Sequence, residues 1–177
     1  MSSASWPLFG QAWPAGLALA DEMSRFGIEG KRILEVGCGL AIASLVLSQR
    51  GADVTASDQH PLAEEFLRIN VEANGFAPIP FRRIDWADTN PDLGRFDLVI
   101  GSDIVYERDQ PAMLASFFGR HGEPGGEVVV ADPCRPWCGK LVTAMRAEGY
   151  ACTNSPLPLP GPKYEGQPPG RLMRFKR

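Results

Sequence analysis

The residue types that could do chemistry gather where an apolar run ends. Residues 31–36 are typical of a strand and lead directly into Gly37 and Gly39, which a helical pattern follows. Glycines at such a turn let the backbone approach a ligand closely. A second strand-like run ends on Asp58, about 20 residues further on, where nucleotide-binding α/β folds place the carboxylate that binds ribose hydroxyls. This spacing predicts a nucleotide site at the carboxyl ends of two parallel strands.

Two details indicate which nucleotide fits this turn. A dinucleotide fingerprint has a third glycine where the helix packs on the strand, and this chain has Ile42 there. Glu35, two residues before the first glycine, places negative charge beside the ligand. That charge would repel a pyrophosphate but attract S-adenosylmethionine (SAM), whose amino group and sulfonium are both positive. Residues 35–39 therefore resemble the first motif of a SAM-dependent methyltransferase, and a nicotinamide-dinucleotide oxidoreductase is disfavoured.

Alternating strand-like and helix-like segments must position these residues. The strand-like segments are 33–36, 53–57, 80–84, 96–101 and 127–131, and apolar residues at helical spacing lie between them. Residues 96–101 are almost wholly apolar, as expected of a central parallel strand covered on both faces. The alternation predicts a Rossmann-like, doubly wound α/β fold, with a mostly parallel seven-stranded sheet and helices on both faces.

The chain of 177 residues fits one domain. We expect an N-terminal segment and helix over residues 1–30, a cofactor-binding core over 31–150, and a Pro-rich loop with the last strand over 151–177. Residues 155–170 hold six prolines and three glycines, which argues against regular structure there. This loop is either a connector or a lip that faces the substrate. Residues 171–176 are expected to form a final edge strand.

Composition excludes several classes of protein. A net charge of −3 argues against a general nucleic-acid binder. The chain also lacks a run of about 18 apolar residues, which is the pattern that predicts a membrane span. The N-terminus lacks the features of a signal peptide, and four scattered cysteines are too few for a disulfide framework, so we expect a cytoplasmic protein. Cys134 and Cys138 are four positions apart, but no second pair of Cys or His residues completes a zinc site with them, so no metal is expected. His60 and His121 are interpreted as surface or loop residues without a role.

Five segments, in order and at the right spacings, resemble a known group of enzymes. The group is the seven-β-strand class I methyltransferases, in particular the family that includes small protein-lysine methyltransferases. The segments are Trp-Pro-Ala-Gly at 13–16, residues 34–40, Ala-Ser-Asp at 56–58, Asp-Trp at 85–86, and Ser-Asp-Ile-Val-Tyr at 102–106. The resemblance covers the chain from about residue 10 to residue 135.

The resemblance implies roles for individual residues. It implies that the cofactor is bound by Trp13, Glu35, Gly37, Cys38, Gly39, Asp58, Asp85, Trp86 and Ser102. Adenine could stack on the Trp86 ring, or its amino group could donate to Asp85, and Trp13 would line the methionine end. Asp103 and Tyr106 would lie on the acceptor side, near the transferable methyl group, and residues 132–135 would face the same cavity.

Structural roles remain open for four of these residues. Asp58 and Asp103 could instead cap the helices that follow them. Trp13 could anchor the start of a helix, and Trp86 could be packed in the core.

If the acceptor is a lysine, its amine must be neutral when it attacks. The pKa of a lysine amine is near 10.4, so removing its proton at pH 7 costs about 4–5 kcal/mol. The Asp103 carboxylate would by itself favour the charged form, so we expect it to orient the amine rather than act as a strong base. Tyr106 would hold the amine through its hydroxyl and close the pocket with its ring.

These observations predict a SAM-dependent N-methyltransferase that modifies a lysine side chain of a protein. One alternative is a methyltransferase for a small-molecule amine or heterocycle, since relatives of this shape are also labelled by similarity to nicotinamide N-methyltransferase. The short N-terminal segment and the small size give it weight. A SAM-binding interaction module without catalysis is a further alternative, which the presence of Glu35, Asp58, Asp103 and Tyr106 disfavours.

Overall fold

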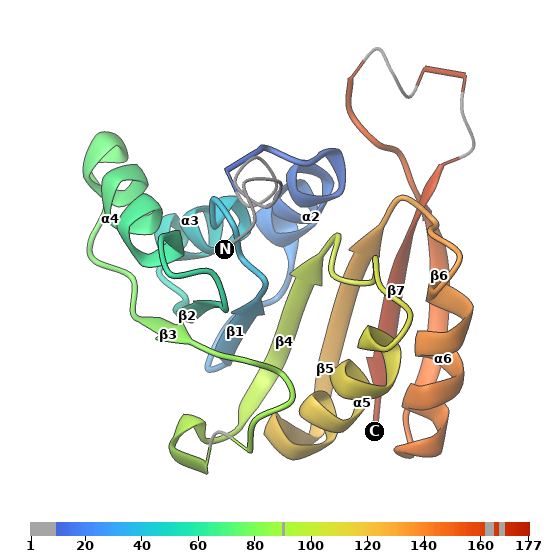
Figure 1. Cartoon of the computed structure of the whole chain (residues 1–177). Coiled ribbons are helices and arrows are strands. Elements are labelled where there is room, and N and C mark those ends of the chain that lie inside the picture. Colours follow the sequence, from blue (N-terminus) through green and yellow to red (C-terminus); the bar gives the residue numbers. More distant parts are fainter. Residues whose placement is uncertain (1–9, 90, 162–164, 167–168) are drawn as a thin grey trace.

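Seven strands form one sheet, and helices cover both of its faces (Figure 1). This computed structural model describes residues 10–89, 91–161, 165–166 and 169–177. Along the chain the elements are α2 Pro14–Arg25, β1 Arg32–Val36, α3 Ile42–Gln49, β2 Asp53–Asp58, α4 Ala63–Asn74, β3 Phe81–Arg83, the 3-10 turn η1 Pro91–Leu93, β4 Phe96–Ser102, α5 Gln110–His121, β5 Gly122–Asp132, α6 Cys138–Ala147, β6 Ala151–Leu157 and β7 Gly170–Lys176.

The strand order is β3-β2-β1-β4-β5-β7-β6. The first five strands pair in parallel, whereas β7 pairs antiparallel with both β5 and β6. The predicted α/β fold with a mostly parallel seven-stranded sheet is therefore confirmed. The carboxyl ends of the five parallel strands meet at one edge of the sheet, which is where such folds bind their ligands.

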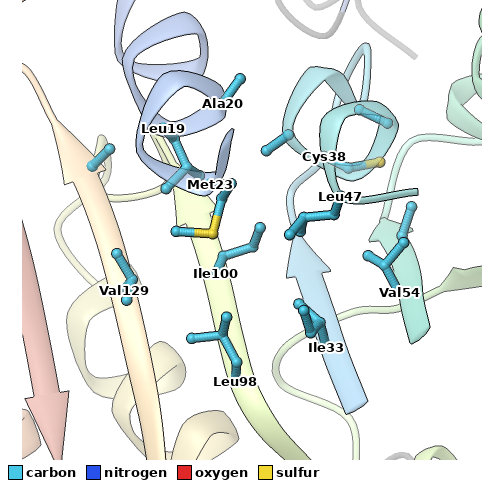
Figure 2. Close-up of a cluster of buried hydrophobic side chains, with 14 of the residues drawn as sticks. Leu19, Ala20, Met23, Ile33, Cys38, Leu47, Val54, Leu98, Ile100 and Val129 are labelled. Atoms are coloured by element: carbon cyan, nitrogen blue, oxygen red, sulfur yellow. The ribbon is translucent and has the colours of Figure 1, made fainter. Parts of the chain in front are cut away.

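Two apolar layers hold the helices on the sheet. Because successive strand residues point to opposite faces, Ile33 of β1 packs under α2, α3 and α4, while its neighbour Leu34 packs on the side of α5 and α6. Figure 2 shows Met23 of α2 and Leu47 of α3 over the first face. Ile33, Leu34, Met23 and Leu47 are all fully buried, and burial of each such side chain stabilises the fold by about 1.5–3 kcal/mol.

Two expectations about the C-terminal segment are wrong. β7 is not an edge strand, because it lies between β5 and β6. Residues 155–157 belong to β6 and are regular. Pro156 is tolerated there because β6 is the edge strand, where a missing N–H need not pair. Residues 162–164 and 167–168 of the Pro-rich loop lie outside the described residues, so its role as a connector or a substrate-facing lip stays a prediction.

The expectation for the two histidines is wrong for His121. This residue ends α5 and is buried, with its Nδ1 2.8 Å from the Gly94 carbonyl oxygen and its ring against Phe117. Across the described ranges, no helix is both long and apolar enough to cross a membrane.

Candidate active site

A cavity of about 310 Å³ lies at the carboxyl ends of the parallel strands. Its lining combines the start of α2, the β1–α3 turn, the end of β2, and the segments that follow β3, β4 and β5. Its volume is at the lower end of the range of small-molecule sites, roughly 300–1,000 Å³. Ten of the eleven predicted site residues line it: Trp13, Glu35, Gly37, Cys38, Gly39, Asp58, Trp86, Ser102, Asp103 and Tyr106.

Asp85 is the exception, because it does not line the cavity. Its Oδ1 accepts a hydrogen bond from the backbone N–H of Ala87, at 2.9 Å. Trp86, the next residue, packs against the core on the α5 side and also lines the cavity. The stacking of adenine on its ring stays a prediction. A role for Asp85 toward a ligand stays a prediction.

The turn after β1 needs glycine for two separate reasons. Gly37 has a φ of 62° and Gly39 a φ of 51°, in the left-handed region that side chains disfavour. In addition, a Cβ at Gly37 would lie 2.8 Å from Ile104 Cγ2 and 3.4 Å from Trp86 Cζ2. The turn therefore packs directly against Ile104 and Trp86, and only glycine lets its backbone come this close to them at the wall of the cavity.

Glu35 lines the cavity and also anchors helix α3. Its Oε2 accepts the backbone N–H of Ser44 at 2.9 Å and the Ser44 hydroxyl. Ser44 is the third residue of α3, so the carboxyl satisfies a free donor of the first helical turn. Burial nevertheless raises the pKa of Glu35 from its ordinary 4.5 to about 7, against the effect of the Ser44 hydrogen bonds. The expectation that Glu35 simply presents negative charge is therefore incomplete, because near pH 7 it is only partly ionised.

Asp58 ties the end of β2 to the glycine turn. Its Oδ2 accepts the backbone N–H of Gly39 at 3.0 Å, and its Oδ1 accepts that of His60 at 2.8 Å. Asp58 is largely buried, with only 9% of it accessible. It does not cap α4, whose N-cap is Leu62. Each carboxylate oxygen still has a lone pair for a ligand hydroxyl.

Asp103 follows β4 in a backbone conformation that is unusual for a residue with a side chain. Its φ is 56°, and its N–H donates to Ala131 of β5 at 3.0 Å. Its Oδ1 lies 2.6 Å from Arg135 Nη2, whereas its Oδ2 is buried without a hydrogen-bond partner among the described residues. Burial raises the pKa of Asp103, and the Arg135 guanidinium opposes this rise. Asp103 does not cap α5, whose N-cap is Asp109.

Tyr106 is held at the mouth of the cavity by a residue that the sequence patterns missed. The buried Gln110, first residue of α5, accepts through Oε1 the backbone N–H of Tyr106 at 2.8 Å and that of Glu107 at 2.9 Å. Tyr106 itself is 44% exposed. The only sign of this role in the sequence is that Gln110 is a polar residue directly before Pro111 and the apolar first turns of α5.

The remaining predicted residues are placed as follows. Trp13 is the N-cap of α2 and lines the cavity, so it both starts a helix and faces the site. Burial raises the pKa of the Cys38 thiol well above its usual range, which keeps this thiol neutral. Arg135, from the segment expected to face the cavity, does line it. His60, which was given no role, lines it as well.

The described residues contain no cluster of three or more His, Cys, Asp or Glu side chains that could hold a metal ion. What the site offers is a glycine turn, an aromatic face at Trp86, and the strand-end carboxylates of Asp58 and Asp103, with Tyr106 in the same cavity. These groups suit a nucleoside ligand. Together with the sheet order, they define a class I, seven-β-strand methyltransferase domain.

The particular family follows from comparison with known proteins. The family model described as lysine methyltransferase matches residues 9–136. This match covers well over half of the chain, and the chain belongs to that family.

Individual relatives differ in the acceptor that their names give. Protein N-lysine methyltransferase METTL21A of Danio rerio is 35% identical over 146 residues, covering 75% of this chain and 65% of that protein. Histone-arginine methyltransferase METTL23 of Xenopus laevis is 31% identical over 154 residues, covering 82% of this chain and 66% of that protein. This chain thus spans less than two thirds of the length of either relative. The structure of the ribosomal protein L11 methylase of Lactobacillus delbrueckii subsp. bulgaricus matches with a TM-score of 0.70 at 18% identity, over 90% of this chain and 76% of that one.

Proposed function

We propose that this chain is a SAM-dependent N-methyltransferase that modifies a lysine side chain of a protein. The observation that carries the proposal is that one cavity is lined by the glycine turn and Asp58 together with Asp103 and Tyr106. Membership in the lysine methyltransferase family supports the same reaction and the same acceptor.

On the cofactor side, we assign the ribose to Asp58, which has free lone pairs and lies beside the glycine turn. The adenine would lie against the face of Trp86 that lines the cavity. Glu35, Cys38, Gly39 and Ser102 line the same cavity. Trp13 would lie toward the methionine end, and Asp85, beside Trp86 but outside the cavity lining, could accept from the adenine amino group. When bound, SAM supplies a methyl group on a positively charged sulfur.

On the acceptor side, the chain positions a nitrogen. Asp103 Oδ2 is buried and has no partner among the described residues, so it can accept an N–H from the incoming amine. The half-exposed ring of Tyr106 can cover the amine and exclude water, while its hydroxyl offers a second hydrogen bond. The amine's lone pair forms the new N–C bond, the C–S bond breaks with its electrons left on sulfur, and the amine's proton passes to solvent.

We also propose that the protein is cytoplasmic and binds neither nucleic acid nor membrane. All four cysteines are free, which supports a reducing compartment. The net charge of −3 supports the absence of a nucleic-acid partner.

The proposal is tested with tritiated SAM and a lysate as the source of acceptor. We expect label in a polypeptide, and acid hydrolysis should release it as methyl-lysine. The Asp103→Asn variant in a parallel reaction controls for label that does not depend on this site. Label only in a small molecule would favour the amine or heterocycle alternative. Label in methyl-arginine would mean that the acceptor is an arginine, as the name of the METTL23 relative gives for that protein.

Cofactor identity is tested separately by calorimetry with SAM and with NAD. We expect micromolar affinity for SAM and negligible affinity for NAD. Tighter binding of NAD, or no SAM binding by a folded protein, would overturn the proposal.

A further inference from the structure

Arg135 bridges two carboxylates at the acceptor end of the cavity. Its Nη2 lies 2.6 Å from Asp103 Oδ1, and its Nη1 lies 3.1 Å from Asp132 Oδ2. Its backbone N–H also donates to Asp132 Oδ1 at 2.7 Å. Asp132 is completely buried at the end of β5, so it fixes the guanidinium from the side of the sheet.

The backbone around this bridge is itself held in a costly shape. Asp103 has a φ of 56° and Cys134, just before Arg135, a φ of 74°. Left-handed conformations of non-glycine residues cost about 1–2 kcal/mol each, and they persist where surrounding contacts determine them. The two turns follow the adjacent strands β4 and β5, and the Arg135 ion pair joins them.

The bridge occupies only one oxygen of Asp103. Oδ1 pairs with Arg135, whereas Oδ2 is buried and has no partner in the described part of the chain. On the basis of the function proposed above, we propose that Arg135 is a positioning residue for methyl transfer: it turns Asp103 Oδ2 toward the acceptor nitrogen and offsets the carboxylate's charge, so that the acceptor amine enters neutral.

The charge balance gives the proposal its physical reason. An unpaired carboxylate beside an amine stabilises the ammonium form and raises the amine's pKa by about 1–3 units. An ammonium has no lone pair and cannot attack the methyl group. A guanidinium in contact with the same carboxylate cancels much of that effect and adds a positive charge of its own near the amine. Arg135 therefore permits Asp103 to orient the amine without keeping it protonated.

Other titratable or charged groups face this end of the cavity from several elements. Glu35 of β1, Cys38 after it, Asp58 of β2, His60 before α4 and Tyr106 after β4 line the cavity, while Glu107, Asp132, Cys134 and Cys138 act on these groups or on one another from beside it. Glu35 titrates near neutral pH. All of these groups are present in the wild type and in an Arg135 variant, but the Arg135 charge also lowers the pKa of Asp103 and of Tyr106. A difference between the pH profiles therefore reports the loss of the Arg135 charge from this cluster together with the acceptor amine.

The test compares Arg135→Gln and Arg135→Lys with Arg68→Gln, a control that breaks an exposed ion pair with Glu72 on α4. Initial rates of methyl transfer from tritiated SAM to the polypeptide fraction of a lysate, freed of small molecules, are measured across pH. For Arg135→Gln we expect turnover to fall at every pH because Asp103 is no longer positioned. In addition, the acid limb of the profile should move up by about one pH unit, which is about a further tenfold loss on that limb. SAM affinity should change less than about twofold.

The lysine variant separates charge from shape. Arg135→Lys keeps the positive charge but cannot bind both carboxylates as a fork, so its acid limb should stay near that of the wild type while its turnover falls. Arg68→Gln should match the wild type throughout. Thermal unfolding of each variant identifies any that do not fold, and Arg135→Lys carries the test if Arg135→Gln does not.

Several outcomes would overturn the inference. A loss in Arg135→Gln that is the same at every pH would make Arg135 structural only, and a loss of SAM affinity would place it on the cofactor side. An acid limb that moves equally in the lysine variant would contradict the role of charge. If the wild type binds SAM but transfers methyl to no polypeptide, the proposed function fails and this inference falls with it.

Discussion

Glu35→Gln isolates the energetic cost of a buried carboxyl. Glutamine keeps a side-chain oxygen that can accept both donors of Ser44, and it removes the charge. In the folded protein, burial raises the pKa of Glu35 from 4.5 to about 7. Between these two values the folded state retains a proton that the unfolded chain releases, so the free energy of unfolding falls as pH rises through this window.

The size of the effect follows from the two pKa values. At about 1.4 kcal/mol for each pH unit, the full cost above pH 7 is about 3 kcal/mol, and most of it appears between pH 5 and pH 8. The Glu35→Gln variant avoids this cost. We therefore expect its stability relative to the wild type to increase by about 2–3 kcal/mol from pH 5 to pH 8.

Urea unfolding at pH 5, 6, 7 and 8, without ligand, measures this difference. Glu72→Gln, which removes an exposed carboxylate on α4, controls for the change in net charge. A constant offset between Glu35→Gln and the wild type would refute the reasoning, because it would mean that Glu35 is ionised across the whole range. With SAM present, the wild-type affinity should rise with pH through 7, since a bound cation favours the ionised carboxyl, and the affinity of the variant should stay flat.

Three further predictions concern the cavity. Gly37→Ala should abolish SAM binding measured by calorimetry, because the new Cβ has neither space nor a permitted φ, whereas Gly139→Ala, with open space around it, should not change it. Asp58→Ala should weaken SAM binding by about 2–4 kcal/mol and lower the melting temperature, because two backbone N–H groups lose their acceptor; unchanged affinity would assign Asp58 to the turn alone. Asp103→Asn should reduce turnover about 10²-fold and Tyr106→Phe less, with SAM affinity nearly intact in both, and wild-type turnover of the first would remove Asp103 from the site.

The parallel part of the sheet could be predicted because each strand carries its own signal. The apolar run of β4 and the strand-to-glycine junction of β1 are local patterns that need no knowledge of the rest of the chain. β6 has no such signal, because its residues are mostly exposed and Pro156 interrupts it. It is a strand because β7 pairs with it, and that partner is chosen by the assembled sheet.

The candidate site was predictable in its membership and not in its internal contacts. Motif spacing placed Asp58 and Asp103 at strand ends, and both line the cavity. The pairing of Asp103 with Arg135 depends on how two loops after neighbouring strands approach each other, which no local pattern encodes. The raised pKa of Glu35 likewise comes from desolvation by the folded core, and its link to Ser44 appears only once α3 packs on the sheet.

The position of β7 has a consequence for the order in which the molecule assembles. The edge of β5 pairs with β7 through residues 39 to 49 positions away, from the pair of Asp132 with Arg171 to the pair of Glu127 with Lys176. Pairings that close such long loops form late and slowly. Until β7 docks, the apolar edge of β5 is unpaired, and β6 has no partner in the sheet. An open, hydrophobic strand edge can template pairing with another chain, so the half-assembled molecule is the form most exposed to aggregation, and insertion of β7 is the step that ends that exposure.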